Sequence, residues 1–273
     1  MSSKIRGVVP PLAIPLKDGE LDVPSLERLI NRMIEAGLDG LFVSGSTGEV
    51  AFSTTERRAQ IQREAVRIVD GRIPLLVGVI DTETERVIEN IKAVEEIGGA
   101  TGVVATAPFY ALGGETEVER HFRLLKENTS LELWAYDIPV CVHTKLSPDL
   151  LMRLGRDGVI DGVKDSSGDD VSFRWLCRAN EAAGHPLQLL TGHEVVVDGA
   201  YMSGADGSVP GLANVDPEGY VRQWQAYERR DWEAVRTEQD RLAELMRIVQ
   251  VKGVQGFGAG VGAFKAALHL LGV

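Results

Sequence analysis

Short apolar runs rich in β-forming residues alternate with segments of helical period, and this alternation constrains the fold most strongly. The predicted strands are Val8–Ile14, Gly40–Ser44, Leu75–Ile80, Gly102–Ala107, Leu131–Ile138, Gly158–Asp165, Leu187–Thr191 and Gly207–Val209. Their starts are about 20 to 35 residues apart, which leaves room for one crossover helix each time. Eight such strands predict an α/β fold, a closed parallel (β/α)8 TIM barrel. A doubly wound open sheet also fits the number of strands.

Residues typical of helix ends support the predicted crossovers. The first helix has Pro24 in its first turn and Gly37 just past its end. One face of that helix carries the apolar residues Leu26, Leu29, Ile30, Met33 and Ile34. Ser53-Thr-Thr-Glu56 predicts a capping box at the start of another helix. A related glycine-containing turn recurs between helix and strand at Ala36–Leu41, Gly98–Val103 and Ser203–Ser208.

The alternation stops after Asn214. Three helices are predicted there without intervening strands, over Asp216–Arg229, Asp231–Val249 and Gly262–Leu271. We therefore expect a barrel over residues 1–214 and a C-terminal helical unit over 215–273 packed on it. The glycine-rich segment Gly256–Gly262 lacks the Gly-x-Gly-x-x-Gly spacing of a nucleotide loop and is predicted to be a flexible loop.

Charge and composition limit the classes of binding partner that this chain can have. The chain of 273 residues has 29 Lys plus Arg and 40 Asp plus Glu, a net charge of −11. Such a surface repels nucleic acid and anionic lipid. No uncharged apolar run reaches the roughly 18 residues of a membrane span, and the first residues lack the apolar core of a secretory signal. Two cysteines, Cys141 and Cys177, make no disulfide framework. We expect a cytoplasmic protein without nucleic-acid or membrane partners.

Lys164 is the most unusual candidate for chemistry. It lies late in the sixth predicted strand, where a neutral side chain is expected, and barrel active sites lie at the C-terminal ends of strands. One interpretation is a structural lysine paired with Asp161 or Asp165. The other is a Schiff-base lysine, because burial among apolar strands favours the neutral amine that attacks a ketone.

Further candidates follow other strands. Gly45-Ser-Thr-Gly-Glu49 can point successive N–H groups at an anion such as a carboxylate, although it also reads as a plain turn. Tyr136, in Tyr136-Asp-Ile-Pro139, and Tyr110 lie after the fifth and fourth strands and could equally pack or react. A lysine, a tyrosine and a hydroxyl-rich loop at three strand ends predict an imine-forming site with a proton shuttle.

These motifs also identify a family. The chain resembles the dihydrodipicolinate synthase / N-acetylneuraminate lyase family of pyruvate-handling class I aldolases and synthases, through Gly45–Glu49, Tyr136–Pro139 and Gly162-Val-Lys-Asp-Ser-Ser-Gly168. Gly204–Gly207 and Gly262–Leu268 extend the resemblance over nearly the whole chain. The resemblance implies a TIM barrel with a C-terminal helical extension and a homotetramer built as a dimer of dimers.

The resemblance also implies roles for individual residues. Lys164 is expected to form the imine with pyruvate, and Tyr136 to move protons at the imine carbon and the substrate. Thr47 is expected to pass protons to Tyr136, and Tyr110 to reach into the site of a neighbouring subunit. The carboxylate of the 2-oxo acid would bind to the loop that starts at Gly45. The residues expected to bind substrate are Gly45, Ser46, Thr47, Cys141, His143, Ser166, Gly192, His193, Glu194 and Val209.

Departures from the family pattern bear on the substrate. Cys141 stands where dihydrodipicolinate synthases have an arginine for the second substrate's carboxylate, and a thiol cannot supply that charged fork. The chain is therefore not expected to be a true dihydrodipicolinate synthase. Val195 and Gly211 replace a carboxylate and a serine of the sialic-acid lyases, which favours a polyol partner shorter than sialic acid.

Together these features predict a lyase or aldolase that cleaves or forms a 2-keto-3-deoxy sugar acid, or a similar 2-oxo acid, with pyruvate and an aldehyde as partners. Two alternatives stay open: a dehydratase that uses the same imine, and a non-catalytic barrel that binds a keto acid. The five histidines show no metal-ligand spacing, so neither a metal nor another cofactor is expected.

Overall fold

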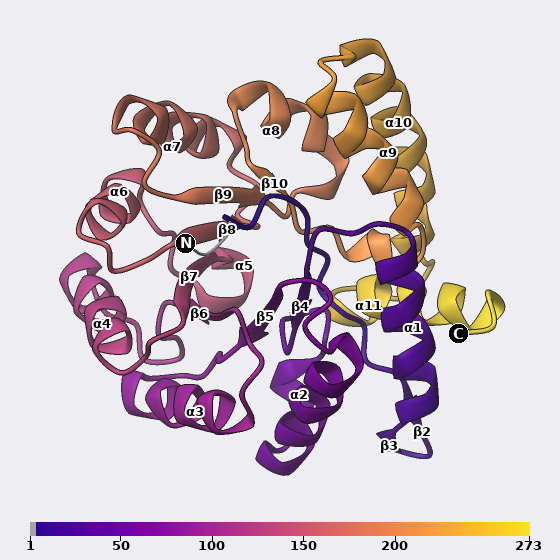
Figure 1. Cartoon of the computed structure of the whole chain (residues 1–273), viewed down its shortest axis with the longest axis horizontal. Coiled ribbons are helices and arrows are strands. Elements are labelled where there is room, and N and C mark those ends of the chain that lie inside the picture. Colours follow the sequence, from indigo (N-terminus) through magenta and orange to yellow (C-terminus); the bar gives the residue numbers. More distant parts are fainter. Residues whose placement is uncertain (1–3) are drawn as a thin grey trace.

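The computed structural model describes residues 4–273, and its centre is a ring of eight parallel strands (Figure 1). In chain order they are β1 (Gly7–Val8), β4 (Leu41–Val43), β5 (Leu75–Gly78), β6 (Gly102–Thr106), β7 (Glu132–Asp137), β8 (Gly162–Asp165), β9 (Gln188–Thr191) and β10 (Gly207–Ser208). Strand β1 pairs with β10, and a parallel bridge between Pro11, in the segment after β1, and Phe42 of β4 closes the ring. The predicted TIM barrel is confirmed.

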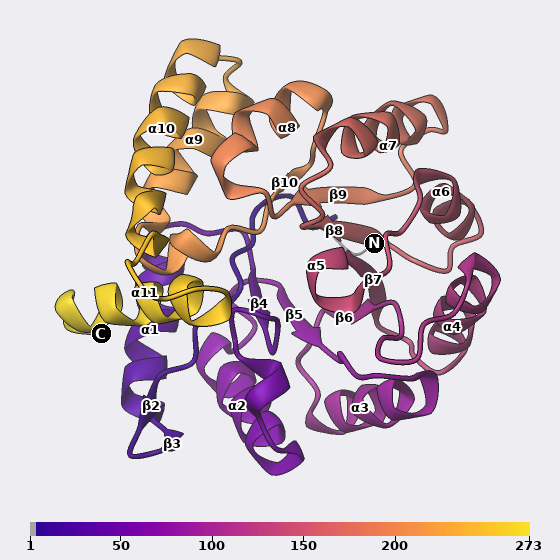
Figure 2. The same cartoon turned by 180° about the vertical axis from the view of Figure 1, so that it is seen from behind.

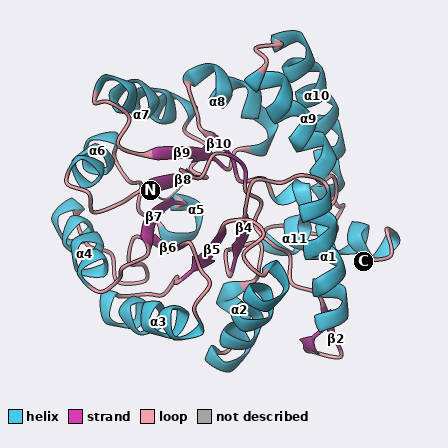
Figure 3. Cartoon of the chain, viewed as in Figure 1, coloured by secondary structure: helices cyan, strands magenta, loops and turns pink. Residues whose placement is uncertain are grey.

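Helices surround the ring on its outside (Figure 3). The crossover helices are α1 (Val23–Glu35), α2 (Thr55–Val69), α3 (Thr84–Ile97), α4 (Glu115–Glu127), α6 (Pro148–Arg156), α7 (Asp170–Ala182) and α8 (Val197–Ser203). A hairpin of β2 (Leu16–Lys17) and β3 (Glu20–Leu21) precedes α1, and the short helix α5 (Pro139–Val142) follows β7. Figure 2 views the barrel from the side on which α5 lies in front of the strands.

Alternation along the strands decides which side chains enter the barrel. On β7, Trp134 and Tyr136 belong to the cluster inside the ring, whereas Leu133 and Ala135 pack with the layer of helices. On β8, Val163 joins the outer layer, so Lys164 points inward. The inner cluster consists of Ile5, Val9, Phe42, Leu76, Val104, Trp134, Tyr136, Ile138, Val142, Leu190 and Val209.

The C-terminal segment contains α9 (Pro217–Glu228), α10 (Trp232–Leu245), a 3-10 turn at Met246–Val249, and α11 (Phe257–Leu270). Helix α9 follows β10 and contacts β1, as the eighth crossover helix of a barrel does. A domain boundary at residue 214 stays a prediction. Within residues 4–273, no helix combines the length and the apolar character that a membrane crossing needs.

Two local predictions are wrong. Helix α2 is capped by Thr54, whose hydroxyl accepts from the Arg57 N–H at 3.2 Å, rather than by Ser53. Helix α11 begins at Phe257, so most of the segment predicted to be a flexible glycine-rich loop is helical. Packing outweighs the low helix propensity of glycine there, because Ala259, Val261 and Phe264 are buried.

Candidate active site

Lys164 lies inside the barrel without a counter-charge. The residue is 6% exposed, and its side chain makes no ion pair with any of the residues 4–273. Its Nζ lies 3.8 Å from the ring centroid of Tyr136 and 5.1 Å from that of Phe42. The alternative of a structural lysine paired with a neighbouring aspartate is wrong, because Asp161 binds Lys126 and Asp165 lies 3.9 Å from Lys145.

Tyr136 is the direct neighbour of Lys164 across two strands. The parallel register of β7 and β8 pairs the two residues, and the side chains share the inner face. The Tyr136 hydroxyl lies 3.5 Å from the Ser46 hydroxyl, and its ring meets Phe42 edge-on at 6.1 Å. Packing fixes the ring, while its hydroxyl faces the loop after β4.

The loop that begins at Gly45 turns tightly beside these two side chains. The Glu49 N–H donates to the Ser46 carbonyl at 2.9 Å, and a Cβ on Gly45 would lie 2.5 Å from the Phe42 ring. Glycine is therefore required at the start of the turn. The Glu49 carboxylate binds Lys265 of α11 at 2.6 Å, which fastens the loop to the C-terminal helix.

Glu194 and Thr47 converge on Gly211. A Cβ added to Gly211 would lie 3.5 Å from the Thr47 hydroxyl, 3.6 Å from Glu194 Oε2 and 2.9 Å from the Phe264 ring. Glu194 Oε1 accepts from the Leu212 N–H at 2.6 Å. Burial raises the pKa of the Glu194 carboxyl to about 7, against the opposing effects of that hydrogen bond and of the Lys164 charge.

The loops after β8 and β9 bring Ser166 and Gly192 together. A Cβ on Gly192 would lie 2.1 Å from the Ser166 hydroxyl, so only glycine leaves room for that side chain. The Gly192 N–H donates to the Asp165 carbonyl at 2.6 Å. Val209, at the end of β10, is buried, and its N–H donates to the Thr191 carbonyl at 2.7 Å.

The other predicted site residues lie further out. Cys141 and His143 are exposed at α5. Partial burial of the Cys141 thiol raises its pKa, and the Lys164 charge opposes that rise. His193 Nδ1 lies 3.0 Å from Asp170 on α7. Tyr110 is 94% exposed and does not reach the other candidates within this chain. No group of His, Cys, Asp and Glu among residues 4–273 could hold a metal ion.

The described chain matches one known protein family over its whole length. The model of the dihydrodipicolinate synthetase family matches residues 4–273. The chain belongs to that family. Members of the dihydrodipicolinate synthetase family are class I lyases and aldolases, so the predicted family and enzyme class are confirmed.

Relatives within the family carry different names. A 4-hydroxy-tetrahydrodipicolinate synthase from Phenylobacterium zucineum (strain HLK1) is 30% identical over 242 residues, 88% of this chain and 80% of that protein. The Escherichia coli (strain K12) protein named "Putative 2-dehydro-3-deoxy-D-gluconate aldolase YagE" is 30% identical over 229 residues, 83% of this chain and 75% of the relative.

Solved structures agree closely in fold. Dihydrodipicolinate synthase from Bacteroides thetaiotaomicron has a TM-score of 0.93 at 31% identity, covering 100% of this chain and 91% of that chain. YagE from E. coli K12, in complex with pyruvate, has a TM-score of 0.92 at 28% identity, covering 99% and 89%.

A buried acid pair behind the site was not anticipated from the sequence. Asp137 and Asp165 are register partners immediately after Tyr136 and Lys164, and both are buried. Lys145 binds Asp137, and the Leu146 N–H donates to the same carboxylate at 3.1 Å. Burial raises the pKa of Asp137 to about 6 despite Lys145, and it raises the pKa of Asp165 as well. One signal in the sequence could have revealed this pair: each aspartate directly follows an inward-pointing residue, Tyr136 or Lys164, at the end of two neighbouring strands.

Proposed function

We propose that this protein is a Schiff-base-forming lyase or aldolase that uses pyruvate as one product or substrate. The observation that carries the proposal is Lys164, a buried lysine without an ion pair, held against Tyr136 across two strands. A lysine that no carboxylate binds leaves its amine free to add to a carbonyl group and form an imine.

The cleavage reaction can be followed atom by atom. The Lys164 amine adds to C2 of a 2-oxo acid, and water leaves with the proton of the Tyr136 hydroxyl, which gives an iminium ion and the Tyr136 phenolate. Tyr136 takes the proton of the C4 hydroxyl, the C3–C4 bond breaks, and its electron pair moves into the iminium to form an enamine. An aldehyde departs. Protonation of the enamine at C3 and hydrolysis of the imine then release pyruvate and restore the amine, and condensation is the reverse.

The Gly45 loop supplies the proposed carboxylate site. Backbone N–H groups and the hydroxyls of Ser46 and Thr47 would hold the carboxylate of the 2-oxo acid close to Lys164. The 3.5 Å separation between the Ser46 and Tyr136 hydroxyls supports a proton path between this loop and the tyrosine. Thr47 would take part in that path, and Tyr110 of a neighbouring subunit would complete it in a homotetramer.

The outer part of the site favours a 2-keto-3-deoxy sugar acid or a similar substrate. Cys141 brings no positive charge for a second carboxylate. Ser166, Glu194 and His193 offer hydroxyl, carboxyl and imidazole groups that suit the hydroxyls of a polyol chain. The name of the relative "Putative 2-dehydro-3-deoxy-D-gluconate aldolase YagE" supports the same substrate class.

The deciding experiment is intact-protein mass spectrometry after incubation with pyruvate and borohydride. We expect wild type and Lys126→Ala to gain one reduced pyruvate adduct, whereas Lys164→Ala and Lys164→Met gain none while keeping the wild-type circular dichroism spectrum. An unmodified wild type would overturn the pyruvate-lyase proposal and leave a keto-acid-binding barrel. With the adduct established, product analysis distinguishes cleavage, which yields an aldehyde, from dehydration, which yields a dioxo acid.

A further inference from the structure

A second cleft, of about 740 Å³, opens at the end of the barrel opposite Lys164. Its lining includes Arg6, which precedes β1, His185, which precedes β9, and Gly204, which precedes β10. These positions mark the N-terminal ends of the parallel strands. Lys164 lies near the C-terminal end of β8, so the second cleft is separate from the candidate active site.

The cleft concentrates positive charge in an acidic protein. Four arginines line it against two glutamates, although the whole chain carries a net charge of −11. Arg178 binds Glu181 at 2.6 Å, and Arg6 lies 3.4 Å from Glu228. The remaining two arginines are Arg174 and Arg230.

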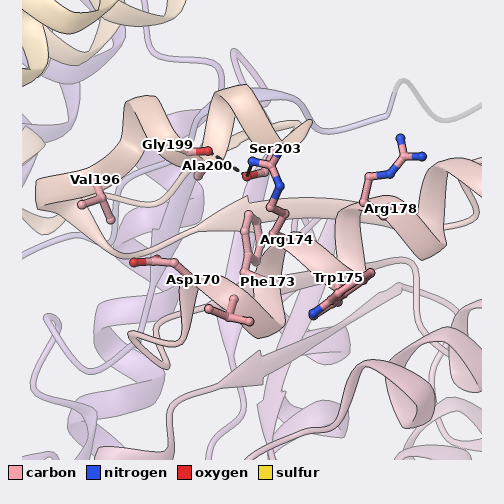
Figure 4. A pocket seen from close by; sticks show the side chains of 10 residues that line it. Asp170, Phe173, Arg174, Trp175, Arg178, Val196, Gly199, Ala200 and Ser203 are labelled. Atoms are coloured by element: carbon pink, nitrogen blue, oxygen red, sulfur yellow. Dashed lines mark hydrogen bonds between the residues drawn. The ribbon is translucent and has the colours of Figure 1, made fainter.

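Arg174 and Arg230 have no carboxylate partner among residues 4–273. Arg174 reaches from α7 to the Ser203 hydroxyl of α8 at 3.3 Å (Figure 4). Asp206 already binds two residues of the cleft, His185 at 2.9 Å and Arg6 at 3.7 Å. Two guanidinium groups are thus left to bind an anion.

Helix ends account for only part of this charge. Helices α7, α8 and α9 end near the cleft at Ala182, Ser203 and Glu228, and helix C-termini carry partial negative charge that arginines offset. Arg174 goes beyond this arrangement, because it lies in the first half of α7 (Asp170–Ala182), away from the C-terminal turn of that helix.

One wall of the cleft is aromatic. Tyr227 stacks on Tyr201 with ring centroids 4.7 Å apart, and Trp232 meets Tyr227 edge-on at 5.6 Å. Trp232 is 42% exposed, so part of its ring is open to a ligand. A flat or apolar group can pack there while its charged end reaches the arginines.

We propose that this cleft binds a small phosphate-bearing molecule. Arg174 and Arg230 hold the phosphate, because the guanidinium fork matches phosphate oxygens in pairs. Trp232 packs against the organic part of the ligand. The cleft volume lies within the range of small-molecule sites, which is about 300–1,000 Å³. Barrel chemistry takes place at the opposite face, so the ligand acts as an effector rather than as the substrate.

Two probes separate the phosphate group from its organic part. Isothermal titration calorimetry with pyrophosphate and with ATP is expected to show one site for each. Arg174→Gln and Arg230→Gln are each expected to weaken the binding of both probes by about tenfold or more, because each substitution removes a charged hydrogen-bond donor. Trp232→Ala is expected to weaken the binding of ATP but not that of pyrophosphate. Tighter binding of ATP than of pyrophosphate to the wild type is expected, and equal binding of the two probes would contradict the role of Trp232.

The matched control is Arg156→Gln, which removes an exposed charge on α6 that has no ion pair with the described residues. This variant is expected to bind both probes as the wild type does. Absence of saturable binding at millimolar probe overturns the proposal. So does binding that survives in Arg174→Gln and Arg230→Gln, or that falls equally in Arg156→Gln. The test needs no turnover, so its result is independent of the proposed lyase activity.

Discussion

Lys164 illustrates how a barrel can hold a charged residue without pairing it. The faces of Tyr136 and Phe42 can accommodate a protonated ammonium group through their ring quadrupoles, yet they do not fix it as a carboxylate would. Release of the proton therefore leaves no buried carboxylate unpaired. A lysine bound to Asp165 would lose this freedom, and Lys145 takes that place instead.

The hydroxyl of Tyr136 is expected to act at the proton-transfer steps. Tyr136→Phe keeps the ring that packs on Phe42 but removes the group that faces Ser46. We expect exchange of the pyruvate methyl protons with D2O, followed by NMR, to slow by about 10²–10⁴-fold. Borohydride should still trap the imine in this variant. An exchange rate equal to that of the wild type would remove Tyr136 from the proton path.

Asp137 is expected to lower stability as the pH rises. Its pKa rises from 3.8 to about 6 on folding, so the folded state holds the proton more tightly than the unfolded state does. The contribution of the protonated carboxyl is complete below pH 3.8 and is lost as the pH rises through about 6. It is at most about 3 kcal/mol.

The comparison of wild type with Asp137→Asn isolates this contribution. Urea unfolding at pH 4 and at pH 7.5 should show the variant gaining stability relative to wild type as the pH rises, because an amide does not titrate. A difference between the two proteins that stays constant over this range would contradict the raised pKa.

At the scale of elements, helix α11 shows how packing overrides composition. Its first turns contain Gly258, Gly260 and Gly262, yet the helix forms because its buried side pairs with the barrel. Phe257 also meets Phe52 edge-on at 5.5 Å. The segment connects to the site through the ion pair of Lys265 with Glu49.

Alanine at two of these glycines is expected to stabilise the protein. A Cβ at Gly260 or at Gly262 would meet no atom within 4 Å, so each substitution should add about 0.5–1 kcal/mol of helix stability. Gly211→Ala is the contrasting variant, because its Cβ would lie 2.9 Å from the Phe264 ring. In thermal unfolding, the midpoint temperature should be higher than that of the wild type for Gly260→Ala and Gly262→Ala, and lower for Gly211→Ala. A lower midpoint for Gly262→Ala would contradict the helical start of α11.

The sequence predicted the strands well because period and turn chemistry are local. Alternation on β7 and β8 was enough to bring Tyr136 and Lys164 together. The start of α11 was missed because glycine has the same local signature in a loop and in a packed helix. The binding of Asp137 by Lys145 was missed because the partners meet only when the segment after β7 folds back.

At the scale of the whole molecule, apolar side chains remain on the outside of the barrel. Val171 and Trp175, both on α7, are 70% and 67% exposed. Both residues line the cavity in Figure 4. Exposed apolar groups of this size favour contact with another protein surface. A second copy of the chain is the partner that the predicted dimer of dimers requires.

The oligomeric state of the protein should therefore depend on the exposed side chains of α7. We expect light scattering to give a tetramer for the wild type and a dimer for Trp175→Glu, because a buried carboxylate at an interface is unfavourable. Methyl-proton exchange of pyruvate should persist in that dimer if Tyr110 completes the site across a different interface. A tetramer that survives in Trp175→Glu would place the contact elsewhere, and Phe52→Glu, exposed near α11, serves as a control of equal charge.

The closure of the ring also has a consequence for biogenesis. Strand β1 pairs with β10, and Gly7 and Gly207 approach so closely that a Cβ on Gly207 would lie 2.0 Å from the Gly7 carbonyl. Strand β1 leaves the ribosome first, but one of its edges stays unpaired until β10, the last strand of the ring, has been synthesised. Synthesis cannot complete this fold from one end to the other, and a nascent chain halted before Gly207 exposes an open sheet edge to chaperones and proteases.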